Sequence, residues 1–251
     1  MNEYSLNFVI DAKDLDVINE AQLRLTLAKC VNQGSPSNVA WIAAKPFVSN
    51  IVEWKDEYGL YASTTEIKKG ATLTKLSETG VPSFDNAYYS FKKAGYFTGP
   101  HADGQIGVIG KGTYAALNEM PTEYHKALTF GLTQTALINN HKEERCPLSA
   151  HLVPSQFTMR ATPFTIVYAW LAATTKSGMI ITEVAGPSTM ITLGSDVKKL
   201  TLKYNSEHAK FLPIGKDGQA VELPGVQLLE SGIPCRAEAR LEACAASPSL
   251  Q

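Results

Sequence analysis

A short tryptophan-containing segment occurs twice in the chain, and this repetition restricts the fold more than any other feature. Residues 40–44 read Ala-Trp-Ile-Ala-Ala, and residues 169–173 read Ala-Trp-Leu-Ala-Ala. Further along, residues 65–69 match residues 195–199 in the same order. Several matches in one order, separated by loop-sized differences in length, indicate that one structural unit has been duplicated.

The matches predict two domains followed by a tail. Copy one covers residues 1–118 and copy two covers residues 119–225, so each is near the usual size of a domain. Pro121 favours a linker between them, because its ring restricts the backbone and bars a continuous helix or strand ladder. Residues 226–251 have no counterpart in copy one, and we expect a flexible tail or a short helix there.

Local patterns predict strands within each copy. Leu23, Leu25 and Leu27 stand at alternate positions, which places them on one face of a strand. Residues 164–170 are rich in β-branched and aromatic side chains, which is typical of a buried strand. We therefore expect an all-β protein of two tandem, internally duplicated antiparallel β-sandwich domains, immunoglobulin-like or similar. Helix signals are weak and lie over residues 14–20 and 122–126, and the short helix of the tail would cover residues 236–246.

Trp41 and Trp170 occupy equivalent positions in the two copies. A large aromatic ring on a strand of this kind is usually buried, and its burial stabilises the fold by at least ~1.5–3 kcal/mol. Both tryptophans are therefore expected to anchor a core.

The charge balance argues against nucleic-acid binding. The chain has 23 basic and 24 acidic residues, a formal net charge of −1, so it lacks the basic surface that phosphate binding requires. A net charge this close to zero does little to keep molecules apart, which leaves self-association into a homo-oligomer open.

The sequence contains few features that indicate where in the cell the protein resides. The first residues lack the basic start and apolar stretch of a signal peptide, and the apolar run over residues 164–173 is shorter than the ~20 residues of a membrane helix. Four cysteines without a CxxC pair fit a reducing compartment. We expect a cytoplasmic protein, or one exported without a recognisable signal peptide.

Motifs that carry catalysis or bind metals are absent from the sequence. There is no GxSxG, P-loop or HExxH sequence. His141, Cys146 and His151 would still need a fourth zinc ligand or water, and the aspartates of residues 11–16 lack the spacing of a calcium loop. We therefore expect no metal, no cofactor and no catalytic residue, although an enzyme with dispersed catalytic residues stays an alternative.

Aromatic residues gather in copy one and form the candidate ligand-binding site. Aromatic rings with a polar tip suit sugar rings, lipid headgroups or a protein partner. The alternative is that these rings simply fill the edge of the sandwich. At three of these positions copy two has residues of other types, which favours a specialised role in copy one. The candidates are Trp54, Tyr58, Tyr61, Tyr88 and Tyr89.

These observations leave four hypotheses of function. The first is a non-catalytic binding protein, lectin-like, with a glycan or a protein as its ligand; two linked modules would gain avidity. The second is a membrane-active or pore-forming protein that acts at a membrane surface through the charge-poor hairpin of residues 162–195. The third is a self-assembling structural protein, and the fourth is the enzyme with dispersed residues.

Overall fold

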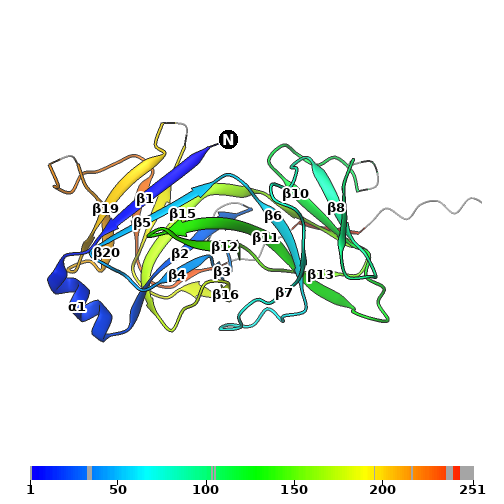
Figure 1. Ribbon diagram of the computed structural model, residues 1–251, viewed down its shortest axis with the longest axis horizontal. Helices are drawn as coiled ribbons and strands as arrows, with labels where there is room; N and C mark the ends of the chain where they lie inside the picture. The colour runs from blue at the N-terminus through cyan, green and yellow to red at the C-terminus, as the bar shows by residue number, and fades with distance from the viewer. Residues whose placement is uncertain are drawn as a thin grey trace, which may run out of the picture.

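Strands make up most of the chain, which confirms the expectation of an all-β protein. A helix, α1 (Ala12–Glu20), lies near one end of the long axis, and the strands β8 (Ala87–Phe91) and β10 (Tyr114–Asn118) lie near the other (Figure 1). The computed structural model describes residues 2–32, 36–102, 104, 106–194, 196–215, 217–235 and 240–243.

Among these described residues, nine strands form the largest sheet. Its order is β20 (Lys210–Pro213), β19 (Lys199–Asn205), β1 (Glu3–Val9), β5 (Ser49–Lys55), β11 (Ala127–Ile138), β6 (Gly59–Ser63) and β7 (Lys75–Glu78). The strands β12 (His141–Pro147) and β13 (His151–Pro154) also pair with β11.

The remaining strands form smaller sheets. One has the order β23 (Arg240–Ala243), β14 (Phe157–Ala161), β10, β8 and β9 (Phe97–His101). Another has the order β21 (Val226–Leu229), β18 (Ser188–Thr192), β15 (Pro163–Ala173), β2 (Leu23–Val31) and β4 (Ile42–Ala44). Two short pairs join β16 (Met179–Ile180) to β3 (Val39–Ala40) and β17 (Glu183–Val184) to β22 (Ile233–Pro234).

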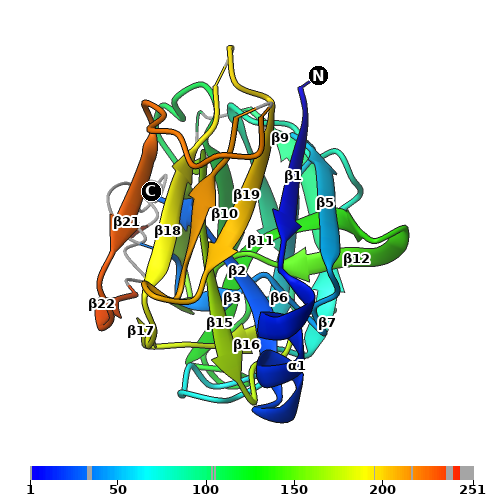
Figure 2. The ribbon, with the colours of Figure 1, turned by 90° about the vertical axis from the view of Figure 1, so that its left-hand side faces the viewer.

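The main hydrophobic core lies between the sheets. Viewed along the long axis, β18 and β21 lie on one side of the molecule and β1 and β5 on the other (Figure 2). Alternation along β5 shows how the sequence divides the two faces, because Val52 and Trp54 are buried while Glu53 and Lys55 are exposed. Leu25 and Leu27 of β2 enter the same core, as their spacing predicts.

Strands from the two predicted copies pair with each other, so the duplication into separate domains is not confirmed. In the largest sheet β1 runs parallel to β19, and in a smaller sheet β2 pairs with β15 along most of its length. Residues 1–118 and 119–225 therefore share sheets and a common core. Backbone hydrogen bonding between strands does not depend on the side-chain similarity that suggested the repeat.

The two tryptophans of the repeated segment are both buried, as expected, but they flank one strand. The Trp41 amide donates to the Leu27 carbonyl at 2.8 Å, on one side of β2. Trp170 lies in β15 and is paired with Thr26, on the other side of β2. Both tryptophans are therefore core residues, but both lie against β2 and do not occupy equivalent positions in two separate domains.

The described part of the predicted tail forms strands. β21 pairs with β18, β22 with β17 and β23 with β14. The expectation of a helix over residues 236–246 is therefore wrong for residues 240–243, and the remainder of that segment lies outside the described residues. These segments form strands because each pairs with the open edge of a neighbouring strand, whose backbone groups would otherwise lack partners.

The helix expected over residues 14–20 is confirmed by α1, whereas residues 122–126 form a turn. In that turn the amides of Tyr124 and His125 both donate to the Pro121 carbonyl. The segment is too short to nucleate a helix in the absence of tertiary contacts.

The charge-poor segment of residues 162–195 is part of the sheets. β15 pairs with β2 and β18, and β16 pairs with β3, so residues 179–185 do not form the returning strand of a hairpin with β15. Val167, Ala169 and Trp170 are buried. In the part of the chain that the structure describes, no helix is long and apolar enough to cross a membrane.

Candidate functional site

A cleft of about 420 Å³ opens on the largest sheet, and we call it the β5 cleft. Its lining comes from β1, β5, β11, β12 and β19, together with Glu57 in the loop after β5 and Val81 in the loop after β7. Tyr4 and Trp54 contribute to its wall, and three glutamates and three lysines stand around it. The charged residues are Glu3, Glu53, Glu57, Lys55, Lys142 and Lys199.

The pairing of β1 with β5 positions one wall of the β5 cleft. Glu3 lies opposite Lys55 in the register, and their side chains form an ion pair at 2.8 Å. The hydrogen bond from Lys55 lowers the pKa of the Glu3 carboxyl, and the same contact raises the pKa of Lys55. Both groups therefore keep their charges at neutral pH.

An irregularity in strand pairing shapes the floor of the cleft. β5 and β6 follow each other along one edge of β11, where Trp54 pairs with Ala136 and Gly59 pairs with Thr133. Residues 55–58 therefore face only two residues of β11, and the pairing of β11 with β12 shifts at the same place. Bulges of this kind re-aim side chains and are frequent beside functional sites.

Gln134 lies in β11 at this irregularity and forms hydrogen bonds to groups on both sides of it. Its Nε2 donates to the Lys55 carbonyl at 2.6 Å, and its Oε1 accepts from Lys29 Nζ at 2.8 Å. Its own carbonyl accepts from Trp41 Nε1 at 3.3 Å. Gln134 thus connects Lys29 of β2, a strand of a smaller sheet, to the backbone of Lys55 beside the β5 cleft.

Lys29 lies in a cage of three aromatic rings beneath the cleft. Its Nζ is 5.1 Å from the ring centroids of Trp41 and Trp54 and 5.6 Å from that of Tyr58. Such contacts stabilise an ammonium by up to about 2 kcal/mol when it is desolvated. Burial lowers the pKa of Lys29 to about 7, and the negative charge of Asp56 acts in the opposite direction.

Lys29 was missed by motif searching, although the sequence contains a signal for it. The strand reads Leu-Thr-Leu-Ala-Lys-Cys-Val over residues 25–31, and lysine is almost never fully buried without partners. The Lys29 side chain has no exposed surface and contacts the Trp54 ring, which lines the cleft, so Lys29 supports the site without lining it.

The five aromatic residues predicted to bind a ligand are all buried, with exposed fractions of 0–6%. Trp54 and Tyr58 meet at Lys29, and Trp54 alone of the five lines the β5 cleft. The hydroxyl of Tyr61 donates to the Ser149 carbonyl at 2.8 Å, in a separate hydrophobic cluster.

Tyr88 and Tyr89 lie in β8, which belongs to a smaller sheet than the one that holds Trp54 and Tyr61. The Tyr88 ring packs against His101, and the Tyr89 hydroxyl accepts from the Phe84 amide at 3.0 Å. The five rings do not form one exposed surface, because each is held by its own core contacts. Ligand binding by the set stays a prediction.

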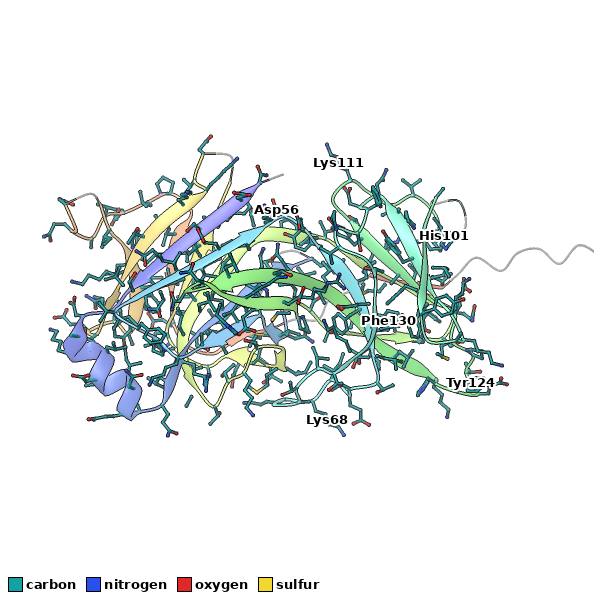
Figure 3. The ribbon with its side chains drawn as sticks, viewed as in Figure 1. Asp56, Lys68, His101, Lys111, Tyr124 and Phe130 are labelled. Carbon is teal, nitrogen blue, oxygen red and sulfur yellow. The ribbon has the colours of Figure 1, made fainter. Side chains whose placement is uncertain are left out.

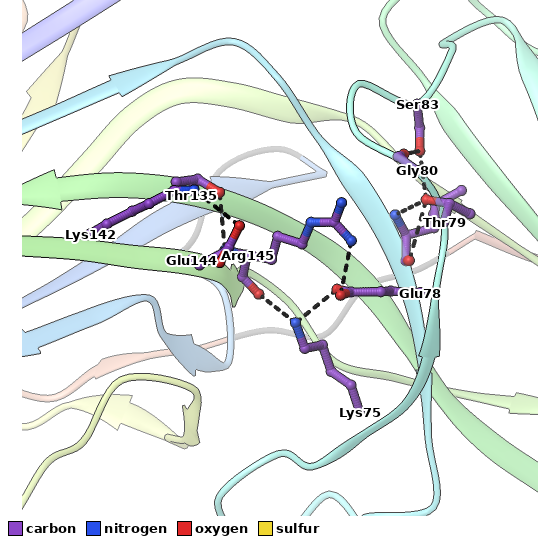
Figure 4. Close-up of polar contacts among 10 residues, drawn as sticks. Lys75, Glu78, Thr79, Gly80, Ser83, Thr135, Lys142, Glu144 and Arg145 are labelled. Atoms are coloured by element: carbon purple, nitrogen blue, oxygen red, sulfur yellow. Dashed lines mark hydrogen bonds and ion pairs between the residues drawn. The ribbon is translucent and has the colours of Figure 1, made fainter.

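A network of ion pairs stands beside the β5 cleft (Figure 4). Glu78 lies between two cations, with Lys75 Nζ at 2.8 Å and Arg145 Nη1 at 2.9 Å. Lys75 also donates to the Arg145 carbonyl at 3.2 Å, and the Arg145 amide donates to Thr135 Oγ1 at 3.1 Å. Thr135 lines the cleft, so the network fixes the position of one of its walls.

The histidines and cysteine considered for zinc lie on β12 and β13. Burial raises the pKa of the Cys146 thiol to about 12, so it is not held as the thiolate that zinc requires. No group of three potential metal ligands occurs among the residues that the structure describes. Of the aspartates considered for calcium, Asp11 forms an ion pair with Lys203 at 2.9 Å.

Comparison with known proteins adds no further constraint. No protein-family model, curated protein or solved structure matches the chain. The fold and the β5 cleft define an all-β protein with an open, mixed polar and apolar cleft, and function has to be argued from that cleft.

Proposed function

We propose that the protein is a non-catalytic binding protein whose ligand occupies the β5 cleft. The observation that carries the proposal is the cleft itself, whose volume of about 420 Å³ lies in the usual range of small-molecule sites. Its walls belong to paired strands, and Gln134 and the ion-pair network hold them in place. A site on such rigid elements is already formed before the ligand arrives.

The composition of the lining favours a sugar. Leu137 and Val81 offer apolar surface, and Glu53, Glu57 and Lys199 offer charged groups next to it. A sugar ring has an apolar face of C–H groups and an edge of hydroxyls that donate to carboxylates and accept from ammonium groups. We therefore propose an oligosaccharide as the ligand, which makes the protein lectin-like.

The ionisation of the cleft supports binding rather than catalysis. An efficient general acid or base has a pKa near the working pH. In the cleft, the pKa of Glu3 is lowered and that of Lys55 is raised by their mutual contact, which moves both away from neutrality. Lys29, whose pKa lies near 7, has no exposed surface.

A glycan array probed with the full chain tests this proposal. The cleft variant carries Glu53→Gln and Lys199→Gln, which are exposed substitutions that leave the net charge unchanged. The matched control carries Glu123→Gln and Lys111→Gln, two exposed positions outside the cleft; Figure 3 labels Lys111 in the half of the molecule away from α1.

The expected result is specific binding by the wild type and the control, and its loss in the cleft variant. Absence of binding to every glycan would overturn the sugar as ligand. Binding that survives in the cleft variant would overturn the β5 cleft as its site.

A further inference from the structure

A second cleft, of about 440 Å³, lies where α1 leads into β2, and we call it the α1 cleft. The pairing of strands brings its lining together, because Arg24 of β2 pairs with Ala172 of β15 and Leu25 pairs with Ala44 of β4. The chain segments that leave β4 and β15 at this end carry Lys45 and residues 174–176.

The charge of the α1 cleft is uncompensated. Arg24, Lys45 and Lys176 line it, and no carboxylate does. Among the described residues, none of these three side chains takes part in an ion pair or hydrogen bond. The β5 cleft, by contrast, has equal numbers of lysines and glutamates, and the chain as a whole has a net charge of −1. Three cations facing one cavity attract an anion and repel one another until it arrives.

Four neutral polar side chains line the α1 cleft, and three of them are hydrogen-bond donors without a partner in the described structure. These three are Asn19, Gln22 and Thr174, whereas the Thr175 hydroxyl donates to the Ala173 carbonyl at 3.3 Å. Amide and hydroxyl groups both donate to anionic oxygens, and such bonds are stronger than those between neutral groups. The donors therefore reinforce the preference that the three cations create.

The backbone at the cleft is unusual as well. Thr174 has a φ of 59° and Gln22 a φ of 54°, both in the left-handed region. A β-branched residue such as threonine rarely adopts this conformation, and it persists only where the surroundings hold it. Residues of this kind are concentrated at ligand-binding sites.

The end of α1 opposes anion binding, but more weakly than the cations favour it. The helix ends at Glu20, and the carbonyl end of a helix carries the equivalent of about half a negative charge. The amides of Ala21 and Gln22 already donate to two of its last carbonyls. Three full positive charges outweigh this partial charge.

We propose that the α1 cleft binds a small molecule that carries two or more phosphoryl groups. The planar guanidinium of Arg24 suits the oxygens of a phosphoryl group in pairs, and Lys45 and Lys176 act as point charges on the others. The volume suits a small molecule, and all three of these cations line the same cavity. The proposal is independent of the sugar site.

The test is calorimetric titration of the full chain with inorganic pyrophosphate in low-salt buffer. The cleft variant carries Arg24→Gln and Lys176→Gln, and the matched control carries Lys111→Gln and Lys126→Gln, which are exposed and outside the cleft. Loss of two charged hydrogen-bonding groups should weaken binding about 100-fold, whereas the control should bind like the wild type.

Three outcomes would overturn the proposal. They are the absence of pyrophosphate binding by the wild type at millimolar concentration, equal weakening in the cleft variant and the control, and citrate binding as tightly as pyrophosphate. Because all the substitutions are exposed, equal melting temperatures of the variants will show that the comparison is between folded proteins. The single substitution Lys45→Gln, which should weaken binding about 10-fold, gives a second independent readout.

Discussion

Replacing Lys29 with methionine should change how stability depends on pH. In the unfolded chain the lysine amine has its ordinary pKa of 10.5, and burial lowers it to about 7 in the fold. Between these values the unfolded chain holds a proton that the folded chain lacks. The free energy of unfolding therefore rises with pH across this window, by about 1.4 kcal/mol per pH unit and about 5 kcal/mol in all, and is lost again as the pH falls towards 7.

Methionine keeps the unbranched stem of the lysine and removes its charge. At pH 7 the substitution removes the ~5 kcal/mol cost of burying the amine, but it also removes about 2 kcal/mol of contact with the rings. It further leaves Gln134 Oε1 without its donor, which costs about 1–3 kcal/mol. The net change at pH 7 is a stabilisation of no more than about 2 kcal/mol, so the slope with pH is the decisive quantity.

Urea denaturation of the wild type and of Lys29→Met, followed by circular dichroism from pH 7 to pH 10, measures that slope. The wild type should gain stability relative to the variant throughout this range. Lys111→Met, which replaces an exposed lysine, should follow the wild type. Parallel curves for the wild type and Lys29→Met would refute the reasoning, because the buried amine would then not be the group that titrates.

Further substitutions test the packing and the ion pairs. A Cβ at Gly131 would lie 1.8 Å from a backbone carbonyl oxygen, so Gly131→Ala should lower the free energy of unfolding by about 3 kcal/mol or more, while Gly80→Ala, which meets open space, should change it by less than about 1 kcal/mol in the same urea assay. Thr174→Gly should raise the melting temperature, since relief of the left-handed φ outweighs the added chain entropy by about 1 kcal/mol, whereas Thr175→Gly should lower it. Glu78→Gln should cost about 1 kcal/mol in low salt and less in 1 M salt; a loss that salt leaves unchanged would contradict the ion-pair account.

Local sequence patterns predicted the local structure well. The alternation of Leu23, Leu25 and Leu27 led to β2, and the weak helix signal over residues 14–20 led to α1. Trp41 and Trp170 are core residues because burial of a large aromatic ring is favourable wherever the backbone permits it. Each of these outcomes depends on a few neighbouring residues.

Strand pairing could not be predicted in the same way. β1 lies beside β19, almost two hundred residues later in the chain, and the hydrogen bonds between them are made by backbone groups common to all residues. Residues 226–229 were also predicted to belong to a tail. They form a strand only because β18 lies beside them and pairs with them, which the sequence of the segment does not reveal. The resemblance between the two halves of the chain carries no information about which edges meet.

The candidate site was predicted only in part. Trp54 was identified and lines the β5 cleft, but its ring faces Lys29 and Tyr4 rather than solvent. Lys29 and Gln134 were missed, since neither belongs to a motif and their contact spans the two sheets. Composition reveals which side chains are present, whereas their placement depends on how the sheets come together.

The most direct test of the proposed function is hydrogen exchange of the full chain with and without the oligosaccharide that the array selects. If the ligand occupies the β5 cleft, backbone amides in residues 53–57 and 134–138, which border it, will exchange more slowly, and those of β8 will not change. Protection confined to β8, or spread evenly over the chain, would contradict the assignment of the cleft as the binding site.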